Sequence, residues 1–244
     1  MHATWSPLAA PARLYPLAGR LIPWFAAAAA VLGVAGGALA LFVAPPDPAQ
    51  GDVARIAFVH VPAAWTSLGL YLAMAACAMV ALGTASRLPA MMMSALAPTG
   101  ALFTVIALAT GSLWGRPTAG AWWVWDARMT SELILLFLYV GFLSLRSAID
   151  EPRRADRAGA VLVIVGVVNL PIIHFSVRWW NTLHQGASAS LASPAATAHT
   201  MLLGMVATSL AFAMYSAAVS LARVRCVMLE READHHRLRQ GEAA

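Results

Sequence analysis

The chain has 244 residues, of which 60% are hydrophobic and only 11% are charged, and its formal net charge is +5. A soluble domain is about 45–50% apolar and about 25% charged, so this composition excludes an ordinary soluble enzyme and a disordered regulator. With only two cysteines it also excludes a disulfide scaffold. The composition indicates an integral membrane protein.

The basic residues and the cysteines exclude several kinds of chemistry. All sixteen basic residues are arginines, and the sequence has no lysine. A P-loop needs its lysine to reach nucleotide phosphates, and a Schiff base needs a lysine amine, so neither is available here. The two cysteines, Cys77 and Cys226, form no CxxC or CxxCH pattern, which excludes a thioredoxin-like oxidoreductase and a c-type cytochrome.

Six stretches are long and apolar enough to cross a bilayer as helices, which takes about 20 mostly apolar residues. In chain order they are 21–43, 61–83, 93–113, 129–145, 159–177 and 199–221, and the fourth and fifth are the shortest. Pro171 is expected to free the carbonyl near Val167 and kink the fifth helix. The first run is too long for a signal peptide, so we expect it to stay uncleaved. The predicted fold is all-α with six transmembrane helices.

The arginines are distributed unequally between the segments that connect these helices. Twelve lie in the N-terminal segment, the second and fourth loops and the C-terminal segment, whereas the odd-numbered loops hold only Arg55, Arg116, Arg128 and Arg178. Because arginine-rich segments stay in the cytoplasm, both termini are predicted to be cytoplasmic and the odd-numbered loops to face the periplasm. The chain then divides into a six-helix membrane domain, 1–222, with a tryptophan-rich segment at 114–128, and a basic cytoplasmic tail, 223–244.

The third loop concentrates aromatic residues. Four of the nine tryptophans, Trp114, Trp122, Trp123 and Trp125, fall within twelve residues and are followed by Asp126. One interpretation is an aromatic belt at the level of the lipid headgroups. The other is a flat, apolar platform for a planar aromatic ligand, and Trp122 and Trp125 would share one face if 122–126 were helical. Composition alone does not decide between the two.

Two of the seven histidines, His60 and His184, lie at the outer membrane boundary, on the side of the tryptophans. His60 directly precedes Val61-Pro62, and proline is common at the first position of a helix. His174, inside the fifth span, is expected to hydrogen-bond backbone or a neighbouring helix. Two imidazoles suit zinc or copper only with further ligands, whereas haem supplies four nitrogens and leaves two axial positions. Unrelated interfacial histidines are the remaining alternative.

Haem also carries two propionates, whose burial requires cations, and arginine offers a bidentate fork. Arg55 lies five residues before His60, and Arg128 lies two after Asp126, so these two are the candidates. Glu132 follows Arg128 by four residues, on the same helical face and about one turn inside the membrane. It either neutralises Arg128 or is a functional ionisable group.

Four separated motifs match one protein family in the same order. They are Trp114-Gly115-Arg116-Pro117 with Gly120-Ala121-Trp122-Trp123-Val124-Trp125-Asp126-Ala127-Arg128, Arg55-Ile56 with Val59-His60-Val61-Pro62-Ala63-Ala64, Ala97-Pro98-Thr99-Gly100, and Val177-Arg178-Trp179-Trp180-Asn181-Thr182-Leu183-His184-Gln185-Gly186. With the length and the six spans, the chain resembles the haem exporter protein C (CcmC) type of the cytochrome c assembly family, which carries a tryptophan-rich WWD motif. Thr118-Ala119 stands where the family pattern has bulkier residues, so Ala119 contributes no stacking surface to the platform.

The resemblance implies that the chain holds haem at the outer face. His60 and His184 would ligate the iron of haem b from opposite sides, and Asp126 would order its loop through backbone N–H groups. The residues expected around the porphyrin and its propionates are Trp114, Trp122, Trp123, Trp125, Asp126, Arg55 and Arg128.

The resemblance also implies partners. Haem would pass to the periplasmic chaperone CcmE, and the small membrane protein CcmD and the ABC transporter subunits CcmA and CcmB would act with this chain in the bacterial inner membrane. ATP hydrolysis would belong to CcmA, which agrees with the absence of lysine here. On this interpretation the protein is a haem-handling scaffold and no enzyme.

Two other functions stay open at this point. One is a permease, the transmembrane half of an ABC transporter, in which Asn169, Pro171 and His174 would line a path; polar residues at bilayer depth are few for such a role. The other is a membrane b-type cytochrome. Such proteins usually place histidine pairs on facing helices at bilayer depth, whereas His60 and His184 are predicted at the boundary.

Overall fold

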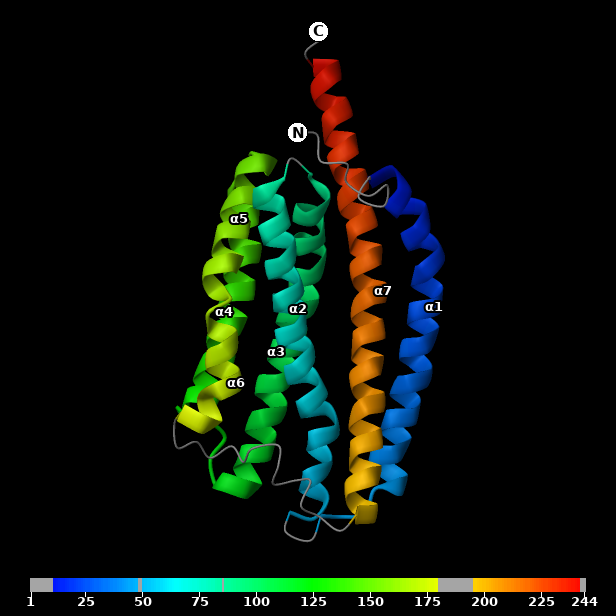
Figure 1. Cartoon of the computed structure of the whole chain (residues 1–244), viewed down its shortest axis with the longest axis vertical. Helices are drawn as coiled ribbons and strands as arrows, with labels where there is room; N and C mark the ends of the chain where they lie inside the picture. The colour runs from blue at the N-terminus through cyan, green and yellow to red at the C-terminus, as the bar shows by residue number, and fades with distance from the viewer. Residues whose placement is uncertain (1–10, 48–49, 85, 180–194, 242–244) are drawn as a thin grey trace.

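The computed structural model describes residues 11–47, 50–84, 86–179 and 195–241, and helices run along one axis of the molecule (Figure 1). In chain order the elements are α1 (Pro11–Ala38), the π-helical turn η2 (Leu39–Val43), the 3₁₀ turn η3 (Asp52–Ile56), α2 (Ala57–Gly83), α3 (Leu88–Ala119), α4 (Ala127–Ala148), α5 (Pro152–Gly166), α6 (Asn169–Trp179) and α7 (Ala195–Gly241). Extended pairing in the described residues is limited to an isolated bridge between Asp47 and Gly51.

Six helical segments are long and apolar enough to cross a membrane. They are Arg13–Val43, Asp52–Gly83, Leu88–Ala119, Ala127–Ala148, Pro152–Ser176 and His199–Glu232. Each overlaps one predicted span, and the fourth and fifth, with 22 and 25 residues, are indeed the shortest. The prediction of an all-α membrane protein with six transmembrane helices is therefore confirmed.

The fifth span is interrupted where Pro171 predicts it. α5 ends at Gly166, α6 begins at Asn169, and the two residues between them form a turn. Proline has no N–H to donate to the carbonyl four residues before it, which is that of Val167. That carbonyl instead accepts from the backbone N–H of Leu170 at 3.1 Å, and the chain changes from one helix to the next.

The start of α2 differs from the sequence prediction. Pro62 was expected to stand at the first position of this helix, but the helix begins at Ala57, directly after η3. Ala57 is a good helix former, and α2 continues through Pro62 although this proline cannot donate a hydrogen bond to the carbonyl of Phe58. His60 therefore lies within the first turn of α2, on a rigid element rather than in a loop.

The helices pack through glycines that face large side chains. Tyr139 of α4 lies against Gly100 of α3, where even a methyl group would overlap the phenol ring, and the Tyr71 hydroxyl of α2 lies equally close to Gly166 of α5. Tyr71 and Tyr139 are fully buried and meet edge-on at 5.2 Å between ring centroids. The Ala97-Pro98-Thr99-Gly100 motif thus lies at the centre of the packing between α2, α3 and α4.

The two ends of the bundle differ in character. The start of α1 and the C-terminal part of α7 lie at one end, here called the terminal end, and α7 projects beyond the other helices there (Figure 1). The segment 120–126, the start of α2 and the described start of α7 lie at the opposite end, here called the Trp end (Figure 1). The first and third connections between spans therefore share one end, as their predicted location on one side of the membrane requires, and the described start of α7 lies at the same end.

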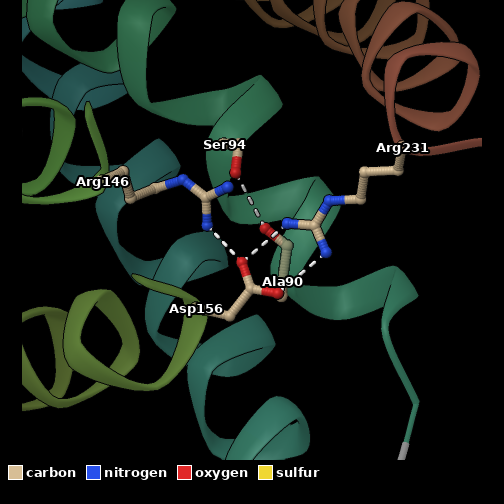
Figure 2. Close-up of polar contacts among 5 residues, drawn as sticks. All are labelled: Ala90, Ser94, Arg146, Asp156 and Arg231. Carbon is tan, nitrogen blue, oxygen red and sulfur yellow. Dashed lines mark hydrogen bonds and ion pairs between the residues drawn. The ribbon is translucent and has the colours of Figure 1, made fainter. Parts of the chain in front are cut away.

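At the terminal end a single carboxylate joins three helices (Figure 2). Arg231 of α7 donates two hydrogen bonds, of 2.8 and 2.7 Å, to the two oxygens of Asp156 in α5, and Arg146 of α4 donates to the same carboxylate. These side chains are only 14–18% exposed. α7 runs without interruption through residues 222 and 223, so Arg231 of the basic tail is tied to the membrane domain.

Candidate functional site

His60 projects from the first turn of α2 onto the side of α3. Its Nδ1 atom lies 3.0 Å from the carbonyl oxygen of Ala107 and 3.1 Å from the hydroxyl oxygen of Thr110. Gly111 lies against the ring as well, because a methyl group there would stand 3.1 Å from the Cε1 atom. The imidazole is half-buried, and two adjacent turns of α3 fix its position.

Trp114 lies one turn further along α3. It contacts both His60 and the loop that precedes η3 and α2. Its indole meets the imidazole edge-on, with ring centroids 5.9 Å apart and planes at 81°. The indole N–H donates to the side-chain oxygen of Gln50 at 2.8 Å, and the backbone N–H of Gln50 donates to Asp47 at 2.9 Å. The structure therefore brings together His60 and the first tryptophan of the WWD motif, which are 54 positions apart in the sequence.

The rest of the tryptophan-rich segment is not helical. α3 ends at Ala119, and Gly120 adopts the left-handed conformation, with φ of +77°, that favours glycine at the end of a helix. Residues 121–126 have no regular secondary structure, so the arrangement in which Trp122 and Trp125 share a helical face does not occur. Asp126 ends the segment as the N-cap of α4 and accepts the backbone N–H of Met129 at 2.7 Å.

The indoles of this segment differ in exposure. Trp122 and Trp125 are 57% and 75% exposed, whereas Trp123 is half-buried and meets Trp125 edge-on at 5.3 Å. The indole N–H of Trp123 is buried and has no hydrogen-bond partner among the described residues. The segment thus presents two apolar faces at the Trp end and anchors them through the third indole.

The two candidate arginines have different surroundings. Arg55, in η3, donates to the carboxylate of Asp52 at 2.8 Å and to the carbonyl of Ala40. Arg128 is half-buried in the first turn of α4, where its charge interacts with those of Glu132 and Asp126. Both side chains start from elements at the Trp end.

Glu132 belongs to a polar network inside the bundle. It is 7% exposed and accepts the hydroxyl of Ser67 at 2.9 Å, and the carbonyl of Ser67 in turn accepts the hydroxyl of Tyr139 at 2.7 Å. Its charge also interacts with that of Arg128. Glu132 therefore takes part in hydrogen bonding inside the bundle in addition to neutralising Arg128.

Several of these partners were missed by sequence reasoning: Gln50, Thr110 and Gly111 around His60 and Trp114, and Ser67 and Tyr139 around Glu132. Their residue types are common in any membrane helix or loop. Only the packing of helices far apart in the sequence gives them a role.

The other predicted residues are described only in part. His184 lies in 180–194, outside the described residues, so the fourth motif is described only up to Trp179. His174 is exposed on α6 and meets Phe175 edge-on at 4.8 Å. Asn169, which the permease interpretation placed along a path, is buried and donates to the backbone carbonyl of Ser131 at 2.8 Å. That bond satisfies the amide within the protein and gives no support to a polar path.

Comparison with known proteins decides the family. The model of the family described as CcmC, Heme exporter protein C, matches residues 4–239. The chain belongs to the haem exporter protein C family. This confirms the resemblance found in the sequence, and the matched range includes the tryptophan-rich segment, His60 and His184.

Individual relatives support the assignment over most of the chain. The chain is 47% identical to Heme exporter protein C of Escherichia coli K12 over 229 residues, which cover 94% of this chain and 92% of that protein. It is 44% identical to the protein of the same name from Bradyrhizobium diazoefficiens, over 92% and 85%. A ccmC-like mitochondrial protein of Marchantia polymorpha, described as a putative cytochrome c biosynthesis protein, is 46% identical over 167 residues, 68% of each chain. A member of this family is a membrane transport component and not an enzyme.

Proposed function

We propose that this chain binds haem at the periplasmic face of the bacterial inner membrane and delivers it to the chaperone CcmE during the biogenesis of c-type cytochromes. The names of its relatives, which combine haem export with cytochrome c biosynthesis, support haem as the cargo. The observation that carries the proposal is the contact of His60 with Trp114 at the Trp end. It supplies an iron-binding imidazole and an aromatic surface at one place.

In this proposal His60 and His184 ligate the iron of haem b from opposite faces. Haem leaves two axial positions, and histidine is a common ligand for them. Trp114, Trp122, Trp123 and Trp125 flank the porphyrin, and Asp126 holds the start of α4 in place through its N-cap bond. Exposed indoles suit this role because a porphyrin is planar and apolar.

Arg55 and Arg128 bind the two propionates. Arg128 lies two residues after the tryptophan-rich segment, and Arg55 lies in the turn that leads into the helix of His60. The anionic partner of Arg55, Asp52, has a side chain that is 76% exposed, and exposed ion pairs contribute only about 0–1 kcal/mol. A propionate therefore competes for this guanidinium at little cost.

The proposed partners follow from the two ends of the molecule. Trp122 and Trp125 form the surface on which CcmE docks, at the end predicted to be periplasmic from the arginine distribution. CcmD, CcmA and CcmB are the proposed partners in the membrane and cytoplasm. Since this chain has no lysine for a P-loop, ATP hydrolysis is assigned to CcmA.

A transfer assay tests the proposal. The purified protein is loaded with haem and mixed with the soluble domain of CcmE, and the Soret band of each protein is followed after separation. Haem is expected to move to CcmE, and to do so at least about thirtyfold more slowly from a Trp122→Ala, Trp125→Ala double variant, because central aromatic contacts each contribute more than about 1 kcal/mol. Trp24→Ala, at a tryptophan 76% exposed on α1, is the control. A wild-type protein that takes up no haem contradicts the proposal.

A further inference from the structure

We propose that Thr110 and the backbone carbonyl of Ala107 fix the tautomer of His60 and so direct its Nε2 atom to the cargo iron. The inference rests on the proposed function, in which His60 ligates haem, and it adds two positioning groups on α3. These groups set how strongly the imidazole binds iron. Thr110 therefore influences how firmly the haem is held before transfer.

The tautomer follows from an account of the hydrogens. The Thr110 hydroxyl donates to the carbonyl of Ile106 at 2.6 Å, with a longer contact of 3.2 Å to that of Ala107. Its hydrogen is thus directed along its own helix, and its oxygen accepts from His60. The Ala107 carbonyl can only accept. Both of these neighbours of Nδ1 within the described part of the chain, at 3.0 and 3.1 Å, are therefore acceptors, and Nδ1 carries a hydrogen.

The position of that hydrogen decides which nitrogen binds iron. A neutral imidazole with a hydrogen on Nδ1 has its lone pair on Nε2. The ring is held in this orientation from other sides, by Gly111 next to Cε1 and by the edge of Trp114. α3 thus presents a single nitrogen of His60 as a ligand.

The same contacts make the imidazole a stronger ligand. A metal-binding histidine that donates its other N–H to a carbonyl gains basicity, and loss of such a partner weakens metal binding about 10–100-fold. Electron donation favours ferric over ferrous iron. Loss of the Thr110 oxygen should therefore weaken ferric haem binding more than ferrous, and a tenfold difference corresponds to a rise of about 59 mV in reduction potential for one electron.

The experiment compares Thr110→Val, which keeps the shape but removes one of the two acceptors of Nδ1–H, with Thr110→Ser, which retains a hydroxyl. Reduction potentials of the haem-loaded proteins are measured by spectroelectrochemistry, and ferric haem loss is followed by transfer to apomyoglobin. Thr110→Val is expected to raise the reduction potential and to speed ferric haem loss about tenfold. Thr110→Ser is expected to keep the wild-type values of both. Thr104→Val is the matched control, since Thr104 makes the same bond to its own helix, at 2.8 Å to Gly100.

A second measurement needs no haem. The ¹⁵N chemical shifts of histidine in the labelled, haem-free protein, assigned with His60→Ala, show which nitrogen of His60 is protonated. A hydrogen on Nδ1 supports the inference, and the Nε2–H tautomer overturns it.

The inference is also overturned if Thr110→Val keeps the wild-type reduction potential while iron remains bound to His60. If His60→Ala leaves the ligation of iron unchanged, the proposed function itself fails, and the two failures are thus distinguishable.

Discussion

Gly111 of α3 lies so close to His60 of α2 that a methyl group at position 111 would stand 3.1 Å from the Cε1 atom of the imidazole. The close approach of the two helices at the Trp end thus depends on the absence of a side chain. It brings the imidazole against the backbone of α3, where its Nδ1 lies 3.0 Å from the carbonyl of Ala107.

Gly111→Ala is expected to displace the imidazole by a few tenths of an ångström and to weaken haem binding about tenfold, the lower range for loss of support behind a metal ligand. A haem titration followed at the Soret band measures the effect. Gly69→Ala is the control on α2, because nothing lies within 4 Å of a methyl group there. Equal affinity in both variants and the wild type would show that the position of His60 does not limit binding.

Gln50→Leu is expected to release the indole of Trp114. The variant removes the acceptor of a 2.8 Å hydrogen bond, and leaving a half-buried donor without a partner costs about 1–3 kcal/mol. The environment of Trp114 is followed by tryptophan resonance Raman bands, and haem retention by gel filtration. Gln50→Glu keeps an acceptor and should retain haem. A Trp114 signal that does not change in Gln50→Leu would argue against this buttress.

Gly100→Ala is expected to destabilise the bundle strongly, because the added methyl group would overlap the ring of Tyr139. Overpacking of a tight core typically costs about 1–3 kcal/mol, and the loss is measured by thermal unfolding in detergent. Gly37→Ala, which faces open space on α1, should have no effect. Combination with Tyr139→Leu should recover part of the loss; no recovery would contradict the assigned contact.

Asp156→Asn is expected to loosen α7 from α4 and α5. The variant leaves the guanidiniums of Arg146 and Arg231 without their shared carboxylate. Loss of one partner of a fully buried pair costs about 3–5 kcal/mol, and we expect about 2 kcal/mol here because the three side chains are 14–18% exposed.

The control for this cluster is Glu151→Gln. Glu151 pairs with Arg154 at 3.1 Å, but their side chains are 55% and 81% exposed, and exposed pairs contribute about 0–1 kcal/mol. Thermal unfolding in detergent should therefore separate the two variants clearly. Equal unfolding temperatures would show that the cluster does not hold α7.

The membrane spans could be predicted from sequence because their signal is local. Bilayer thickness sets the length of an apolar run, and Pro171 interrupts its helix through an N–H that it lacks, so the break after Gly166 follows from chemistry within one turn. Pro62 shows the limit of the same rule. Proline is compatible with more than one position near a helix start, and the preceding residues moved the start back to Ala57.

The candidate site could be predicted only in its main residues. His60 and the tryptophans stand out because histidine and clustered tryptophan are rare in apolar segments. Thr110 and Gln50 do not stand out, and their roles depend on contacts with His60 and Trp114 that are 50 and 64 positions away in the sequence. The conformation of 121–126 could not be predicted either. It depends on Gly120, whose left-handed conformation ends α3, and on Asp126, whose N-cap bond begins α4.

The central claim is that His60 and His184 hold haem together. Its most direct test is a haem titration of the purified wild-type protein beside His60→Ala, His184→Ala and His174→Ala, with the ferric low-spin signal recorded by electron paramagnetic resonance. We expect the first two variants to lose the bis-histidine signal, while His174→Ala, at an exposed residue of α6, should bind haem as the wild type does. An unchanged signal in His60→Ala or in His184→Ala would contradict it.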